Sequence, residues 1–137
     1  KRFIFIGITV LNYRKRGVNM FIFYFIELMI MPILMIVCGM LWRKNPPKTI
    51  NKVYGYRTTR SMKSKESWDF AHKYFGRIWF KLGLVLAVFT VIILFMFKNS
   101  SDNTLVIAVV ILMIIQMIAL IVPIIPTEMA LKRKFEK

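Results

Sequence analysis

The chain has 137 residues, of which 58% are hydrophobic, and its formal net charge is +15. This apolar content exceeds that of an ordinary soluble domain, so the composition excludes the soluble globular class. The chain has one cysteine, Cys38, and one histidine, His72, which exclude an intrachain disulfide and a tetrahedral zinc site. We therefore expect an integral membrane protein that needs no metal and no cofactor.

Three stretches are long and apolar enough to cross the hydrocarbon core, which takes about 20 helical residues. They are residues 20–42, 78–97 and 104–126. Only the polar segment KNSSDN, residues 98–103, separates the second stretch from the third, so these two must form an antiparallel helical hairpin. The predicted fold is all-α with three transmembrane helices.

The basic residues predict the orientation in the membrane. The loop at residues 43–77 is rich in lysine and arginine, and the C-terminal tail carries Lys132, Arg133 and Lys134. The positive-inside rule places both segments in the cytoplasm and the N-terminus outside. Topology and anionic membrane lipids already account for these charges, so we expect lipid partners and no nucleic acid. The predicted location is a cell membrane, which the chain crosses several times.

Residues 1–19 fit this scheme poorly. The apolar run FIFIGITVL is too short to span, and Arg14, Lys15 and Arg16 oppose an N-terminus outside. Met20 stands directly before the first span. We therefore expect residues 1–19 to be an upstream extension or a non-native leader, followed by a membrane domain at residues 20–137.

The loop at residues 43–77 has a distinctive sequence. Pro46 and Pro47 end the first helix, because proline has no backbone donor with which to continue it. The segment NKVYGYRTTRSM follows at residues 51–62, where Gly55 permits a tight turn between two tyrosines. Arg57 and Thr58 offer donors for an anion or a carboxylate.

The segment SKESWDFAHKYFGRIWF is predicted to form an amphipathic helix that leads into the second span, with Ser64 as its N-cap. Aromatic residues recur on one face, and charged residues follow at i,i+4 on another. We expect this cytoplasmic interfacial helix to lie along the headgroups with its aromatic side chains inserted. His72 lies on the aromatic face, where a structural role is favoured over a catalytic one.

These motifs together resemble the signature of the SdpI family of bacterial membrane immunity proteins. The matching residues are Ile50, Asn51, Tyr54, Gly55, Tyr56, Arg57, Thr58, Ser61, Trp68, Ala71 and Gly76, followed by Thr127, Glu128, Leu131 and Phe135 near the C-terminus. The resemblance implies protection against a secreted toxic peptide, and in one member a signalling role through a cytoplasmic regulator. It also implies that the toxin or partner is bound by Asn51, Tyr54, Gly55, Tyr56, Arg57, Thr58, Trp68 and Glu128.

Arg57 and Glu128 both fall on the cytoplasmic side of the predicted topology. We expect them to form a charge-assisted pair that joins the loop to the end of the third helix. An equally weighted alternative is that Arg57 contacts a lipid phosphate.

Two polar residues lie within the predicted spans. Glu27 is an acidic group that either marks a functional site or lies near enough to the outer surface to meet water or Lys98. Gln116 is expected to form hydrogen bonds between helices rather than to contact a ligand.

Three functions compete. The first is a non-enzymatic immunity protein, and the second is a membrane scaffold for a soluble regulator. The third is a small transporter subunit, which would need a homo-oligomer because three helices enclose little volume. No catalytic set of residues appears in the sequence, so we expect no enzyme.

Overall fold

The structure is a computed structural model that describes the backbone of residues 2–136 and the side chains of residues 20–136. It contains four helices: α1 (Arg2–Lys44), α2 (Lys65–Phe97), α3 (Asp102–Ile121) and α4 (Ile124–Phe135). The described backbone has no strand, which confirms the all-α prediction. Three helical stretches are long and apolar enough to span a membrane: Met20–Lys44, Lys65–Phe97 and Asp102–Phe135. The three predicted spans are therefore confirmed. The proposed extension, residues 1–19, lies outside the described side chains, and its origin stays a prediction.

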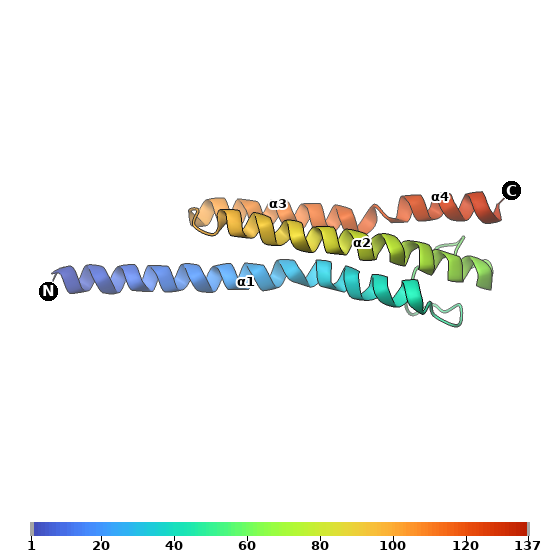
Figure 1. The fold of residues 1–137 in the computed structure, drawn as a ribbon, viewed down its shortest axis with the longest axis horizontal. Helices are drawn as coiled ribbons and strands as arrows, with labels where there is room; N and C mark the ends of the chain where they lie inside the picture. The colour runs from blue at the N-terminus through green and yellow to red at the C-terminus, as the bar shows by residue number, and fades with distance from the viewer. Residues whose placement is uncertain (1, 137) are drawn as a thin grey trace.

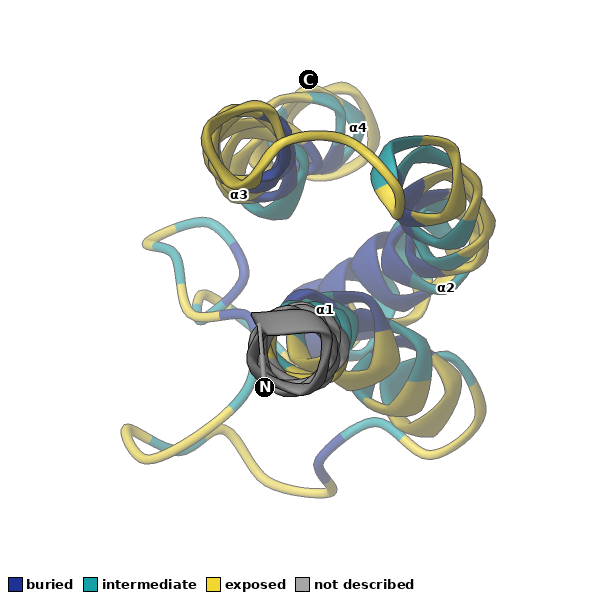
Figure 2. Cartoon of the chain, turned by 90° about the vertical axis from the view of Figure 1, so that its left-hand side faces the viewer, coloured by how far each residue is buried: buried dark blue, intermediate teal, exposed yellow. Residues whose placement is uncertain are grey.

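The helices lie side by side along one axis (Figure 1). The α1–α2 loop and α4 lie at one end, called here the loop end, and the α2–α3 turn lies toward the other. The two basic segments therefore share one end of the molecule, as the predicted topology requires. Figure 2 looks along the helices and shows their buried faces turned toward one another and their exposed faces turned outward.

Helices α1 and α2 pack closely because glycines line their contact. A Cβ atom on Gly76 would lie 2.8 Å from the backbone nitrogen of Arg43 and 2.9 Å from the carbonyl oxygen of Gly39. A Cβ atom on Gly39 would lie 2.5 Å from the backbone nitrogen of Phe80. Small residues allow this approach of two backbones, which is a common way to join helices in membranes.

A buried polar contact joins all three spans. The Gln116 side-chain nitrogen on α3 donates to the carbonyl oxygen of Leu28 on α1 at 3.0 Å and to the Thr90 hydroxyl on α2 at 3.1 Å. In a helix the Leu28 carbonyl would accept from residue 32, but Pro32 has no N–H. Gln116 therefore satisfies the acceptor that Pro32 leaves open, which confirms the prediction of an interhelical hydrogen bond. Within residues 20–136, Glu27 has no hydrogen bond or ion pair through its side chain, and its proposed contact with Lys98 is not formed.

The third span ends at a proline break. Helix α3 ends at Ile121, and α4 begins at Ile124, directly after Pro123. The Thr127 hydroxyl donates to the Pro123 carbonyl oxygen at 2.7 Å and so satisfies a backbone group at the break. Helix α4 continues toward the loop end and carries the basic tail (Figure 1).

The segment predicted as an interfacial helix forms the N-terminal part of α2, but it does not lie in the predicted orientation. Ser64 caps α2 by accepting from the Ser67 N–H, and the helix continues unbroken into the span. Its aromatic face packs inside the protein, since Trp68 is 0% exposed and Phe75 is 4% exposed. The expectation that these aromatics insert among headgroups is wrong, because the loop and α1 cover them.

Candidate functional site

An aromatic cluster anchors the loop at the loop end. The Trp68 indole N–H donates to the Pro47 carbonyl oxygen at 2.8 Å, which fixes the start of the loop on α2. Trp42 on α1 stacks on Trp79 with ring centroids 5.4 Å apart. The Tyr56 ring lies 4.7 Å from that of Phe75. Aromatic contacts of this kind hold the loop against α1 and α2.

Gly55 and His72 set the path of the loop. Gly55 has a φ of 111°, and a Cβ atom there would lie 2.3 Å from His72 Nε2. No other residue type fits both the backbone angle and the space. The next backbone N–H, that of Tyr56, donates to His72 Nε2 at 2.9 Å, and His72 Nδ1 lies 2.8 Å from the Trp68 carbonyl oxygen.

This hydrogen-bond pattern requires a neutral imidazole with its proton on Nδ1, since Nε2 accepts. Burial lowers the pKa of His72 and outweighs the hydrogen bond to Trp68, which raises it. His72 precedes the predicted second span and lies in the part of α2 that projects toward the loop. The expected structural role of this histidine is therefore confirmed.

Local turns shape the rest of the motif. The Asn51 side-chain oxygen accepts from the backbone N–H groups of Val53 and Tyr54, each at 3.0 Å. The buried Ser61 hydroxyl accepts from the Thr58 N–H at 2.8 Å and lies 2.9 Å from the Tyr56 carbonyl oxygen, to which it can donate. These bonds replace the regular backbone pairing that a loop lacks.

A group of five residues, called here the latch, joins the loop to α4. It consists of Tyr56, Arg60, Lys63, Glu128 and Glu136. The Tyr56 hydroxyl donates to Glu128 Oε1 at 2.8 Å, and Arg60 Nη1 donates to Glu128 Oε2 at 3.0 Å. Arg60 Nε and Lys63 Nζ both donate to the carboxylate of Glu136, at 3.0 and 2.6 Å. Arg60 thus bridges two carboxylates at the C-terminal end of the chain.

The latch shifts the pKa values of its members. Burial raises the pKa of Tyr56, and the adjacent Glu128 carboxylate raises it further. Burial of Glu128 opposes its ionisation, but hydrogen bonds from Thr58, Tyr56 and Arg60 prevail and lower its pKa. Hydrogen bonds from Lys63 and Arg60 lower the pKa of Glu136. At neutral pH, Glu128 and Glu136 are therefore ionised and Tyr56 keeps its phenol proton.

The predicted pair of Arg57 and Glu128 is wrong, because Arg60 occupies that position. Arg57 is exposed, and its Nη1 donates to the carbonyl oxygen of Lys52 within the loop. The turn from Gly55 through Ser61 directs residue 57 outward and residue 60 toward α4. The alternative contact of Arg57 with lipid phosphate stays a prediction.

The other predicted site residues divide into engaged and exposed groups. Tyr54, which is 56% exposed, projects from the loop. The remaining signature residues are engaged in contacts that form the loop or join it to the helices: Asn51, Gly55, Tyr56, Thr58, Trp68 and Glu128. Their proposed role in binding a toxin or partner stays a prediction. Within residues 20–136, no group of three or more His, Cys, Asp or Glu is arranged to hold a metal ion.

Sequence reasoning missed Arg60, Lys63, Glu136 and Thr90. Thr90 had a findable signal, because a hydroxyl within an apolar span needs a polar partner and Gln116 lies in the neighbouring span. Arg60, Lys63 and Glu136 had no signal beyond opposite charge, which many residues near them share.

Comparison with known proteins finds a family match over the segment that contains most of the signature residues. The family described as the SdpI/YfhL protein family matches residues 48–127, which include most of the loop, all of α2 and α3, and the start of α4. The protein named "Uncharacterized protein YfhL" from Bacillus subtilis (strain 168) is 48% identical over 54 residues, which cover 39% of this chain and 49% of that protein. The chain therefore spans about half the length of this curated relative. No solved structure matches. Because the family match covers more than half of the chain, this protein belongs to the SdpI/YfhL family.

Proposed function

We propose that this chain is a bacterial membrane immunity protein that protects cells against a secreted toxic peptide without enzymatic chemistry. Family membership supports a membrane immunity-type protein in general, and it is the observation that carries the proposal. In the proposed orientation the loop and α4 face the cytoplasm, and the α2–α3 turn faces outside.

The arrangement of the signature residues is consistent with a non-enzymatic role. Most of them are engaged with one another in the aromatic cluster and the latch. An acyl- or phosphoryl-transfer site would instead need a nucleophile and a base directed at a substrate. In the proposal, these residues hold the loop and α4 in one arrangement, and protection depends on that arrangement.

The test is a challenge assay in cells that lack the gene. Deletion should increase sensitivity to at least one culture supernatant in a panel from related toxin-producing strains, and wild-type protein should restore resistance. Arg60→Ala should lose protection, because Arg60 bridges Glu128 and Glu136. Arg133→Ala is the matched control, because within residues 20–136 this exposed arginine on α4 forms no ion pair.

Membrane levels of both variants must be measured by immunoblotting. Unchanged sensitivity of the deletion strain across the panel would contradict the immunity function. Equal protection by Arg60→Ala and wild type at equal levels would contradict the role of the latch.

A second proposed function is retention of a soluble regulator, favoured by an exposed apolar tip on the loop. Val53 is 85% exposed and Tyr54 is 56% exposed, and Lys48, Lys52 and Arg57 are also exposed in this loop. Exposed apolar residues outside a span are typical of a docking surface. A photo-crosslinking residue at Val53 should capture a soluble protein that the same residue at Ile107, on the exposed face of α3, does not capture. Identical products at both positions would argue against this function.

The transporter alternative has little support. It required a polar track through the spans, but the Gln116 amide nitrogen already bonds Leu28 and Thr90.

A further inference from the structure

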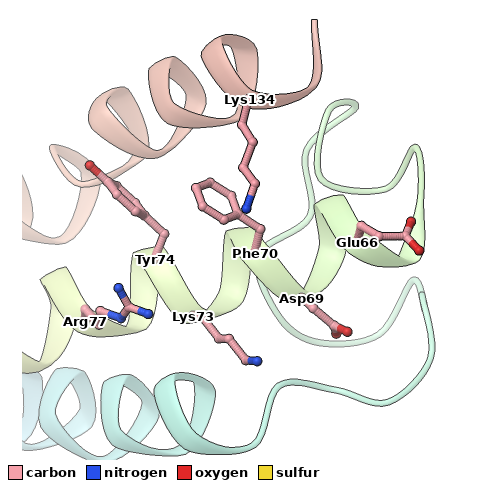
Figure 3. A pocket seen from close by; sticks show the side chains of 7 residues that line it. All are labelled: Glu66, Asp69, Phe70, Lys73, Tyr74, Arg77 and Lys134. Carbon is pink, nitrogen blue, oxygen red and sulfur yellow. The ribbon is translucent and has the colours of Figure 1, made fainter.

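A groove at the loop end, formed by α2 and α4, is separate from the latch. It has a volume of about 350 Å³ and lies between the N-terminal part of α2 and the end of α4 (Figure 3). Its lining combines aromatic and charged side chains: Glu66, Asp69, Phe70, Lys73, Tyr74, Arg77 and Lys134. We propose that this groove binds the phosphate headgroup of an anionic phospholipid.

The charges of the groove favour an anion near its membrane side. Within residues 20–136, Lys73, Arg77 and Lys134 form no ion pair, whereas Asp69 is paired with Lys65. Glu66 lies near the start of α2, farther from the span than Lys73 and Arg77 (Figure 3). Lys73 and Arg77, which have no ion-pair partner, therefore lie where the groove approaches the membrane, and this favours a phosphate there.

The depth of these cations matches the headgroup layer. Helix α2 has 33 residues, so at about 1.5 Å each it is about 20 Å longer than a hydrocarbon core of about 30 Å. The predicted span begins at residue 78, directly after Arg77, and Lys73 lies about one turn farther out. Tyr74 lies between them in sequence, and its side chain points toward α4 (Figure 3), where its hydroxyl can donate to a phosphate oxygen from that side of the groove.

The exposed face of α2 continues from the groove as a path for an acyl chain. Lys73, Arg77 and Lys81 recur at i,i+4, and exposed apolar side chains follow on the same face at Leu84 and Val88. Charge at the surface followed by apolar side chains toward the core is the order within a phospholipid. This continuity favours a lipid over a free anion or an acidic peptide.

Helix α4 supplies the second wall of the groove. Lys134 Nζ lies 4.4 Å from the centroid of the Phe70 ring, which itself stacks on Tyr74 at 5.7 Å. The groove therefore has one wall from α2 and one from α4, and Lys134 adds a cation from the α4 side. These features distinguish a binding site from a diffuse basic surface. A diffuse surface would weaken equally with the loss of any nearby lysine or arginine.

The test measures lipid binding by the full chain in detergent micelles, using native mass spectrometry. Phosphatidylglycerol and phosphatidylcholine with identical acyl chains are titrated separately. The protein should bind phosphatidylglycerol more tightly, and Lys73→Gln with Arg77→Gln should weaken that binding roughly thirtyfold, at about a factor of five or more for each cation. The matched control is Lys44→Gln with Lys48→Gln, which removes two exposed lysines outside the groove. Lys44 follows Arg43, whose backbone nitrogen lies at the level of Gly76, so it also matches Arg77 in depth.

The control variant should keep the wild-type apparent Kd for phosphatidylglycerol. Circular dichroism should show equal helicity for both variants, since all four side chains are exposed. Equal affinity of wild type for the two lipids would overturn the proposal, as would equal losses in the two double variants. Displacement of phosphatidylglycerol by equimolar inorganic phosphate, or by an equimolar polyglutamate peptide, would overturn the assignment to a lipid.

Discussion

The contact between Gln116 and Leu28 leads to a quantitative prediction about the membrane core. Gln116→Leu removes hydrogen bonds to the Leu28 carbonyl and to Thr90, and it leaves that carbonyl without a donor. Hydrogen bonds between membrane helices contribute about 0.6 kcal/mol on average and up to about 1.7 kcal/mol. With the unsatisfied carbonyl added, the free energy of unfolding should fall by about 2 kcal/mol.

The role of Pro32 is tested by measuring the effect of Gln116→Leu in a Pro32→Ala variant. Alanine restores the N–H that Pro32 lacks, so the Leu28 carbonyl can accept within its own helix. In this background Gln116→Leu should lower the free energy of unfolding by only about 1 kcal/mol, because only the Thr90 bond is lost. The coupling between the two substitutions should therefore be about 1 kcal/mol.

The assay is reversible unfolding by sodium dodecyl sulfate in mixed micelles, followed by far-ultraviolet circular dichroism. Ile115→Leu serves as the control, because the adjacent residue on α3 is exposed and makes no buried polar contact. An equal loss in the wild-type and Pro32→Ala backgrounds would refute the claim that Gln116 replaces the missing N–H.

Three further predictions use the same unfolding assay. Gly76→Ala should lower stability by about 1–3 kcal/mol, because its Cβ would meet the backbone of α1 at 2.8 Å; a gain in stability, usual for this change in an exposed helix, would contradict the close packing. Tyr56→Phe should lower stability by about 1 kcal/mol through loss of the bond to Glu128, whereas Tyr54→Phe should have no effect because Tyr54 is exposed; equal effects of the two changes would contradict the latch. The folded protein holds His72 neutral with a lowered pKa, so the unfolded chain binds more protons, and stability should fall as pH drops below about 6.5; His72→Gln should flatten this dependence, and an unchanged slope would contradict it.

The sequence predicted the parts of the fold that depend on hydrophobicity and local chemistry. The three spans follow from long apolar runs, and the hairpin follows from the shortness of KNSSDN. Ser64 caps α2 as expected, because hydroxyl side chains satisfy the free N–H groups of a helix start. Gly55 forms the expected turn, although the sequence did not indicate that His72 would pack against it.

The predictions that failed depended on the tertiary direction of side chains. Arg57 and Arg60 are both arginines in one loop, and only the path of the backbone after Gly55 decides which one faces Glu128. The aromatic face of α2 has the pattern of an interfacial helix, but α1 and the loop cover that face. Periodicity shows that a face is apolar and does not show whether protein or lipid covers it.

The central claim is that the loop and α4 form one unit through Glu128, with Arg60 rather than Arg57 as its partner. Two double-mutant cycles test this claim most directly, Arg60→Ala with Glu128→Ala and Arg57→Ala with Glu128→Ala, both measured as free energies of unfolding. The account predicts a measurable coupling in the cycle with Arg60 and none in the cycle with Arg57. Coupling in the cycle with Arg57, or its absence in the cycle with Arg60, would contradict the account.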